Sequence, residues 1–127
     1  MPGKVVHFEV PADDVDRAIN FYDKAFGWRI ASWPGGEYHL VTTVETDESG
    51  MPTEPGGING GMLKRQNPIS SPVITIQVDD IEDALKTVEA HGGDVVRGKE
   101  PVGEMGFTAY CKDTEGNLVG LWENAGS

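Results

Sequence analysis

Two side chains near the start of the chain combine residue types and a spacing that acid–base or metal chemistry uses. His7 and Glu9 are two residues apart in the alternating segment Val5–Val10, which predicts a strand with both on one face. A neutral imidazole can act as a general base or bind a metal, since its reference pKa is about 6.5. The carboxylate could orient this imidazole or bind a cationic ligand. A solvated strand face requires neither role, so both interpretations stay open.

A second alternating segment offers further candidates for ligand contacts. Residues 73–78 place Thr75 and Gln77 on the polar face of another predicted strand. Trp33, Tyr110 and Trp122 could add an apolar wall, although the sequence does not fix which way Trp33 and Tyr110 face. The candidate ligand-binding residues are therefore polar groups and aromatic rings from several strands: His7, Glu9, Thr75, Gln77, Tyr110 and Trp122.

The elements that must position these residues occur twice. The segment Asp13–Ile19 returns as Asp79–Leu85. Each copy predicts a strand, a helix and three more strands, so we expect an α+β fold of two βαβββ modules. We expect one domain over residues 1–127, with module one at about 4–66, a linker at 67–72 and module two at about 73–124.

Local signals mark the ends of both predicted helices. Asp13 is expected to cap the start of the first helix, and Gly27 its end. In the second copy, Asp79 and Glu82 have the spacing of a capping box. These signals place a helix directly after the first strand of each module.

Composition excludes several classes of partner. The 21 acidic and 10 basic residues give a net charge of −11, which argues against nucleic acid because phosphate binding needs clustered Lys and Arg. No apolar run reaches the roughly 20 residues of a membrane span, and no signal peptide is apparent, so we expect a cytoplasmic protein. Cys111 is the only cysteine, which excludes an intrachain disulfide.

Motifs in both halves resemble one known superfamily. The first half contains His7-Phe8-Glu9-Val10, followed by Asp14-Val15-x-Arg17-Ala18-Ile19-x-Phe21-Tyr22-x3-Phe26-Gly27. The second half contains Val78-Asp79-Asp80-x3-Ala84-x7-Gly92-Gly93 and Asp113-x2-Gly116-Asn117-x4-Trp122-Glu123. Together these motifs resemble the vicinal oxygen chelate superfamily, which includes glyoxalase I, extradiol dioxygenases, and fosfomycin and bleomycin resistance proteins.

The resemblance implies that the paired modules form an open, incomplete barrel around a shared cleft. In metal-dependent members, the first and fourth strands of each module supply the ligands of a divalent cation. His7 matches the first of these positions, whereas the matching positions in module two fall on Val73 and Gly120. The fourth strand of module one offers Gly61 or Met62. His7 is thus the one retained family ligand position.

Two functions are compatible with these residues. The missing ligands favour a protein like the bleomycin resistance branch, which binds or sequesters a small molecule without a catalytic metal or other cofactor. The alternative is a metal-dependent glyoxalase-like lyase or isomerase, in which His7 works with a rearranged ligand set drawn from Glu9, His39 and Glu104. The sequence does not decide whether the protein is an enzyme. It is also compatible with a homodimer, including one that exchanges modules.

Overall fold

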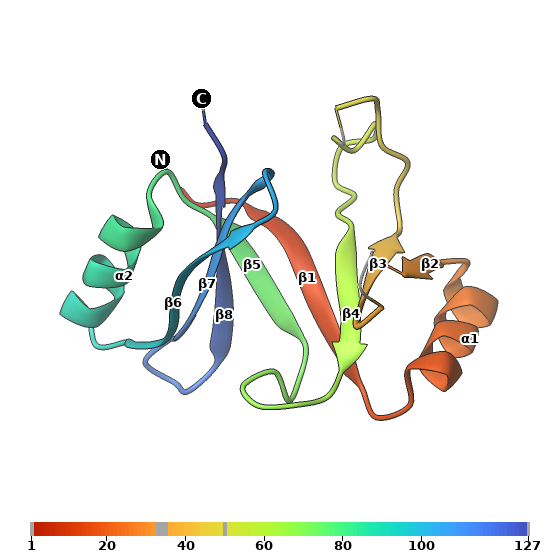
Figure 1. Cartoon of the computed structure of the whole chain (residues 1–127), viewed down its shortest axis with the longest axis horizontal. Helices are drawn as coiled ribbons and strands as arrows, with labels where there is room; N and C mark the ends of the chain where they lie inside the picture. Colours follow the sequence, from red (N-terminus) through yellow and green to blue (C-terminus); the bar gives the residue numbers. More distant parts are fainter. Residues whose placement is uncertain (1, 33–35, 50, 127) are drawn as a thin grey trace. The chain divides into compact units, whose positions relative to one another are not determined.

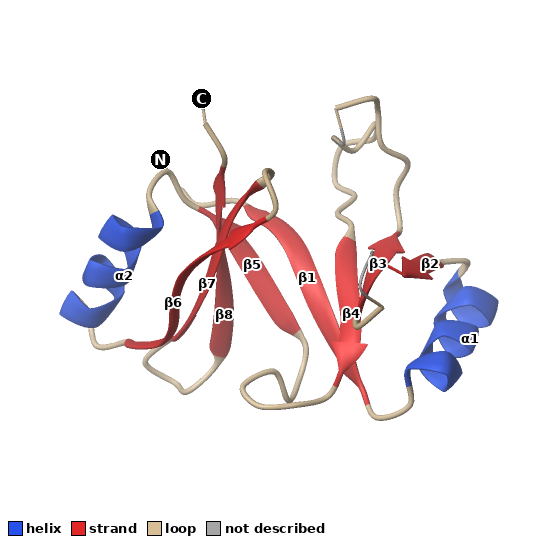
Figure 2. Cartoon of the chain, viewed as in Figure 1, coloured by secondary structure: helices blue, strands red, loops and turns tan. Residues whose placement is uncertain are grey.

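The computed structural model describes residues 2–32, 36–49 and 51–126, and these form two compact units. His7–Pro72 make up the α1 unit, and Met1–Val6 with Val73–Ser127 make up the α2 unit. Each unit carries one helix and one set of strands (Figures 1 and 2). The predicted βαβββ order is confirmed in both modules.

The α1 unit is a four-stranded arrangement with one helix. Its elements are β1 (Val5–Ala12, whose first two residues belong to the α2 unit), α1 (Val15–Phe26), β2 (Arg29–Ser32), β3 (Tyr38–Thr42) and β4 (Gly60–Lys64). The strand order is β2-β3-β4-β1, with β1 parallel to β4 and the other neighbours antiparallel. The parallel pair requires the crossover that α1 supplies.

The α2 unit repeats this topology. Its elements are β5 (Val73–Gln77), α2 (Ile81–Ala90), β6 (Asp94–Val102), β7 (Gly106–Lys112) and β8 (Leu118–Asn124). The strand order is β5-β8-β7-β6, and the first and last strands of the module, β5 and β8, again pair in parallel. The duplication in the sequence therefore corresponds to a duplicated strand order.

The helix caps differ by one residue from the prediction. Asp14, not Asp13, has the extended backbone of an N-cap, and its carboxylate accepts a hydrogen bond from the Arg17 N–H. Asp80, not Asp79, has the same role in α2 through the Asp83 N–H. Each helix starts one residue later than expected. An N-cap side chain bonds to the free N–H groups of the first turn, so the capping residue is the one directly before the helix. The predicted cap at Gly27 is confirmed by its φ of 74°.

Each helix packs its apolar face on the strands of its own unit. Val15, Ala18, Ile19 and Tyr22 of α1 surround a core of Ala12, Val41 and Met62. Ile81 and Leu85 of α2 are themselves buried, against Ala109, Cys111 and Leu121. Each helix therefore covers one face of the strands of its own unit, and the residues that alternate with the core residues project to the opposite face.

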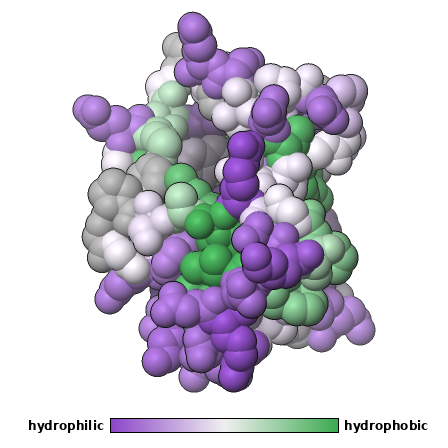
Figure 3. All heavy atoms as spheres, turned by 90° about the vertical axis from the view of Figure 1, so that its right-hand side faces the viewer, coloured by the Kyte–Doolittle hydropathy of each residue, from purple (hydrophilic) through white to green (hydrophobic). Residues whose placement is uncertain are grey.

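The surface reflects the composition. The face in Figure 3 is largely hydrophilic, with a limited apolar area between charged side chains. In the part of the chain that the structure describes, neither helix has the length and apolar character needed to cross a membrane.

Candidate functional site

A chain of two hydrogen bonds joins three polar side chains of the α1 unit. The Tyr38 hydroxyl donates to Glu9 Oε2 over 2.9 Å, and His7 Nε2 lies 2.9 Å from the same hydroxyl oxygen. Glu9 is only 6% exposed, and His7 and Tyr38 are partly buried. The predicted pair of His7 and Glu9 therefore lies together, linked by a phenol that the sequence analysis did not select.

Strand register explains how Tyr38 reaches both partners. Glu9 pairs with Gly61 on β4, and Gly61 pairs with Leu40 on β3, so the three residues form one row across the strands. Tyr38 lies two residues from Leu40, on the same face of β3, and its ring leans over Gly61. A Cβ added at Gly61 would overlap the Tyr38 hydroxyl and ring. The absence of a side chain at Gly61 creates the space that Tyr38 fills.

The surroundings of His7 favour its neutral form. Burial lowers the pKa of His7, and the negative charge of Glu9 opposes that shift to a smaller extent. A buried imidazole loses hydration that its charged form needs more than its neutral form does. His7 is therefore a hydrogen-bonding group without a net charge near neutral pH.

The candidates of the α2 unit share one face of its strands. Thr75 pairs with Gly120, Gly120 with Tyr110, and Gln77 with Trp122. Residues directly opposite each other on neighbouring strands project to the same side. That side faces away from α2, whose core contacts are the alternate residues Ala109, Cys111 and Leu121. Thr75, Gln77 and Trp122 share a strand face, and Tyr110, whose direction the sequence left open, lies on the same face. The binding of a ligand by these four residues stays a prediction.

Gly120 lies under Thr75 as Gly61 lies under Tyr38. A Cβ added at Gly120 would come within 2.8 Å of Thr75 Oγ1. The Tyr110 ring contacts a cation: the Arg97 guanidinium carbon lies 5.6 Å from the centre of the ring. The Trp122 indole donates to Asn124 Oδ1 over 2.8 Å.

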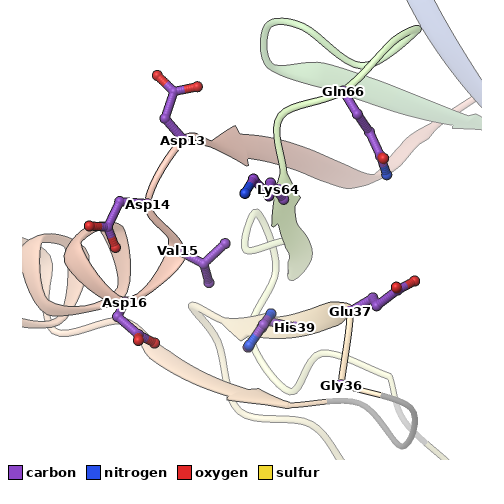
Figure 4. Close-up of a pocket in the computed structure, with 9 residues that line it drawn as sticks. All are labelled: Asp13, Asp14, Val15, Asp16, Gly36, Glu37, His39, Lys64 and Gln66. Atoms are coloured by element: carbon purple, nitrogen blue, oxygen red, sulfur yellow. The ribbon is translucent and has the colours of Figure 1, made fainter.

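His39 does not join the His7 site. It pairs with Met62, a core residue beneath α1, and alternates with Tyr38, so it projects to the helix side. There it lines a hollow between the start of α1 and the strands (Figure 4). Its Nδ1 is buried and, among the described residues, has no hydrogen-bond partner. The expectation that His39 could approach His7 is wrong, because one residue along a strand reverses the side-chain direction.

Glu104, the remaining residue of the rearranged ligand set, is exposed in the turn between β6 and β7, in the α2 unit. Its approach to His7 stays a prediction. Trp33, a candidate for the apolar wall, lies outside the described residues. Over residues 2–32, 36–49 and 51–126, no three His, Cys, Asp or Glu side chains converge as a metal site. Glu9 remains beside His7, but both are bonded to Tyr38.

Tyr38 is the residue that sequence reasoning missed. Tyr38, Leu40 and Thr42 alternate with His39 and Val41, which indicates that Tyr38 and His39 face opposite ways. The apolar Val41 would have assigned its own face, and that of His39, to the core. The available signal therefore excluded His39, whereas the register that brings Tyr38 to His7 required the structure.

Comparisons with known sequences assign a family. The sequence model of the Glyoxalase/Bleomycin resistance protein/Dioxygenase superfamily matches residues 4–121. A glyoxylase-like domain-containing protein from Didymella fabae is 29% identical over 98% of this chain and 96% of its own length. A lactoylglutathione lyase from Haemophilus influenzae is also 29% identical, over 95% of this chain and 93% of its own length.

Solved structures agree on the fold. A member of the same superfamily from Vibrio splendidus matches with a TM-score of 0.62 and 16% identity, covering 96% of this chain and 98% of that one. A Streptomyces coelicolor methylmalonyl-CoA epimerase in complex with 2-nitronate-propionyl-CoA matches with a TM-score of 0.64 and 14% identity, covering 99% and 100%. At this level of identity the likeness extends to the fold alone.

Proposed function

We propose that this chain, which belongs to the Glyoxalase/Bleomycin resistance protein/Dioxygenase superfamily, binds or sequesters a small molecule without a catalytic metal. The observation that carries the proposal is the filling of the fourth-strand position in module one. There Gly61 supplies no ligand atom, and the Tyr38 phenol occupies the space above it. The group that would complete a metal site with His7 is replaced by one that hydrogen-bonds to His7 instead.

The family's metal does not fit the residues at the implied ligand positions. Divalent cations in such sites need several nitrogen or oxygen ligands with open positions for substrate. Module one offers His7 and either Gly61 or Met62, whose thioether lies in the core beneath α1 and is a poor ligand for hard cations, and module two offers Val73 and Gly120. A glycine and a valine carry no side-chain donor. One imidazole among four positions leaves the cation without a ligand set.

The same face has features suited to holding a small organic molecule. It combines hydrogen-bonding groups on His7 and Glu9 with the apolar side chain of Leu40, which is 38% exposed and lies in the same row as Glu9. Ligand sites are commonly apolar surfaces with a few placed polar groups that fix orientation. This combination supports recognition of a ligand without requiring a chemical step.

The second candidate is a metal-dependent glyoxalase-like lyase or isomerase. It is favoured by the likeness to the Haemophilus influenzae lactoylglutathione lyase over nearly the full length of both chains. Shared ancestry fixes the scaffold more firmly than the chemistry, because one fold hosts many reactions. This candidate requires a cation held by His7 and Glu9, in place of the hydrogen bonds that both make to Tyr38.

A thermal-shift screen of small molecules separates the two candidates. The wild-type protein is screened after chelator treatment, beside His7→Ala and the control His91→Ala, whose imidazole is exposed at the end of α2. A binding protein gives ligands that raise the melting temperature of wild type and His91→Ala, but not of His7→Ala. Shifts that are the same in all three proteins would remove His7 from the site. Stabilisation that returns only with added divalent metal would favour the lyase.

A further inference from the structure

The direction of the hydrogen bonds around Tyr38 fixes where His7 carries its proton. A carboxylate accepts hydrogen bonds and cannot donate, so the single proton of the Tyr38 hydroxyl points to Glu9 Oε2. Toward His7 the hydroxyl oxygen can only accept, which means that His7 Nε2 carries a hydrogen. Tyr38 thus orders three groups in one direction, from imidazole to phenol to carboxylate.

The other ring nitrogen of His7 is left as an acceptor. In a neutral imidazole one nitrogen donates and the other accepts, so a proton on Nε2 leaves a lone pair on Nδ1. An imidazole with its reference pKa near 6.5 is mostly neutral at pH 7 and above. Within the described residues, the hydrogen bond to Tyr38 engages Nε2 alone, and Nδ1 has no recorded partner.

The groups near this acceptor favour ligands that donate hydrogen bonds or carry a positive charge. The Glu9 carboxylate accepts the hydrogen bond of Tyr38 and, when ionised, offers acceptors only. Its charge repels a ligand carboxylate and attracts a cation. Leu40 offers apolar contact beside these groups. A ligand group that donates a hydrogen bond is therefore matched to this face, whereas an acceptor or an anion is not.

We propose that Tyr38 is a positioning residue that sets the specificity of this site: by holding His7 with Nδ1 as the acceptor, it selects ligands that present an N–H, O–H or ammonium group. The inference rests on the proposed binding function and deepens it by naming a ligand class. It assigns the selection to the phenolic hydroxyl, not to the ring. Tyr38→Phe keeps the ring over Gly61 and removes only that hydroxyl, so it isolates this role.

The first test reads the tautomer of His7 directly. Nitrogen-15 NMR of histidine-labelled protein, with His7 assigned through His7→Gln, reports which ring nitrogen is protonated. Wild type should show His7 protonated at Nε2, and Tyr38→Phe should show a mixture of both tautomers. Tyr22→Phe, a matched change on α1 where Tyr22 stacks on Trp28, should leave the His7 signals unchanged. A wild-type His7 protonated at Nδ1 would overturn the inference.

The second test measures selection with paired probes. Phenol is compared with anisole, and benzylamine with benzoate, by following the NMR signals of His7 during titration. One hydrogen bond to a placed acceptor corresponds to about tenfold in affinity, so phenol and benzylamine should bind wild type about tenfold more tightly than their partners. The ratios should fall to within about threefold in Tyr38→Phe and stay unchanged in Tyr22→Phe.

The outcomes separate this inference from the binding function on which it rests. Equal binding of phenol and anisole, or tighter binding of benzoate than benzylamine, would overturn the donor selectivity and leave a binding site at His7. Failure of all four probes to perturb His7, together with no hits in the thermal-shift screen, would overturn both. Ratios that persist in Tyr38→Phe would show that the selection does not depend on the hydroxyl.

Discussion

The two modules share one topology but differ in which face of the strands is specialised. In the α2 unit, Ile81 is fully buried, and the Ile81 N–H donates to Glu123 Oε1 of β8 over 2.9 Å. In the α1 unit, no residue of α1 is fully buried over its described range, residues 15–26. Its strands instead carry the chain from His7 through Tyr38 to Glu9 on the opposite face. The α2 helix is thus anchored by buried side chains and a side-chain hydrogen bond, whereas the hydrogen-bonded group of His7, Tyr38 and Glu9 belongs to the α1 unit.

The fourth-strand glycines show how this divergence is built. Gly61 and Gly120 occupy equivalent positions, and each is covered by a side chain from a neighbouring strand. A phenol covers Gly61 and a threonine covers Gly120. In both copies, the fourth-strand position to which the family resemblance assigns a metal ligand is a glycine without a ligand atom. Only in module one does the covering side chain, Tyr38, hydrogen-bond to the residue at the first-strand ligand position, His7.

The largest expected difference between the modules concerns how their helices are anchored. Ile81→Ala should lower the free energy of unfolding by about 3 kcal/mol, because it leaves a cavity in a fully enclosed site. Ile19→Ala on α1 should cost about 1 kcal/mol, since Ile19 is only partly buried and solvent can fill the gap. Urea denaturation measures both. Equal losses would contradict the uneven anchoring of the two helices.

The next largest effect compares the two covered glycines. Gly61→Ala should cost about 2 kcal/mol, because the new methyl group displaces the Tyr38 ring and breaks both of its hydrogen bonds. Gly120→Ala should cost about 1 kcal/mol or less, because its one tight contact is with Thr75 Oγ1 at 2.8 Å, whereas Thr75 Cβ and Cγ2 lie at ordinary contact distances.

The clash itself is tested by a double-mutant cycle with Tyr38→Ala. Once the ring is gone, Gly61→Ala should become nearly neutral, so the two changes should couple strongly in unfolding measurements. Strict additivity would show that Tyr38 is not what excludes a side chain at Gly61.

The covering side chains themselves should differ in a smaller way. Tyr38→Phe should lower the free energy of unfolding by about 1 to 2 kcal/mol, because Glu9 and His7 each lose a partner in a largely buried setting. Thr75→Val, which keeps the shape of the side chain over Gly120, should change it by less than about 0.5 kcal/mol. A larger loss in Thr75→Val than in Tyr38→Phe would reverse the assignment of polar function to module one.

The smallest expected effect is a dependence of stability on pH. Because burial lowers the pKa of His7 below its unfolded value of 6.5, the unfolded chain binds a proton more readily than the folded one. The contribution is fully present above that value and is lost as the pH falls toward the folded pKa. The unfolding free energy should therefore decrease from about pH 7.5 to about pH 5 less steeply in His7→Gln than in wild type.

A matched histidine controls for general acid effects. His91→Gln removes an exposed imidazole at the end of α2, and the change in slope in His7→Gln should exceed any change in this control. Parallel profiles for wild type and His7→Gln would show that folding does not lower the pKa of His7.

The architecture was predictable from the sequence because its signals are local. Alternation in residues 5–10 and 73–78 and the glycine at Gly27 specify elements through their own neighbours, and the repeat then specifies the modules. Cap positions were wrong by one residue because the paired aspartates Asp13-Asp14 and Asp79-Asp80 offer two adjacent candidates.

The site was only partly predictable because it depends on pairing between distant strands. The shared face of His7 and Glu9 follows from strand alternation alone. The arrival of Tyr38 depends on the register between β3 and β4 and on the small volume of Gly61. Neither is visible until strands far apart in the sequence are aligned. The direction of His39, in contrast, was predictable, because His39 alternates with Tyr38 and shares its strand face with the apolar Val41.

The central claim is that module one recognises a small molecule through His7 and Tyr38 without a metal, and metal content tests it most directly. Purified protein, dialysed and analysed for elements beside His7→Ala, should contain no nickel, zinc, iron or manganese in an amount close to one per chain. A value close to one metal per wild-type chain that is lost in His7→Ala would contradict the account, because it would show that His7 serves as a ligand despite the phenol beside it.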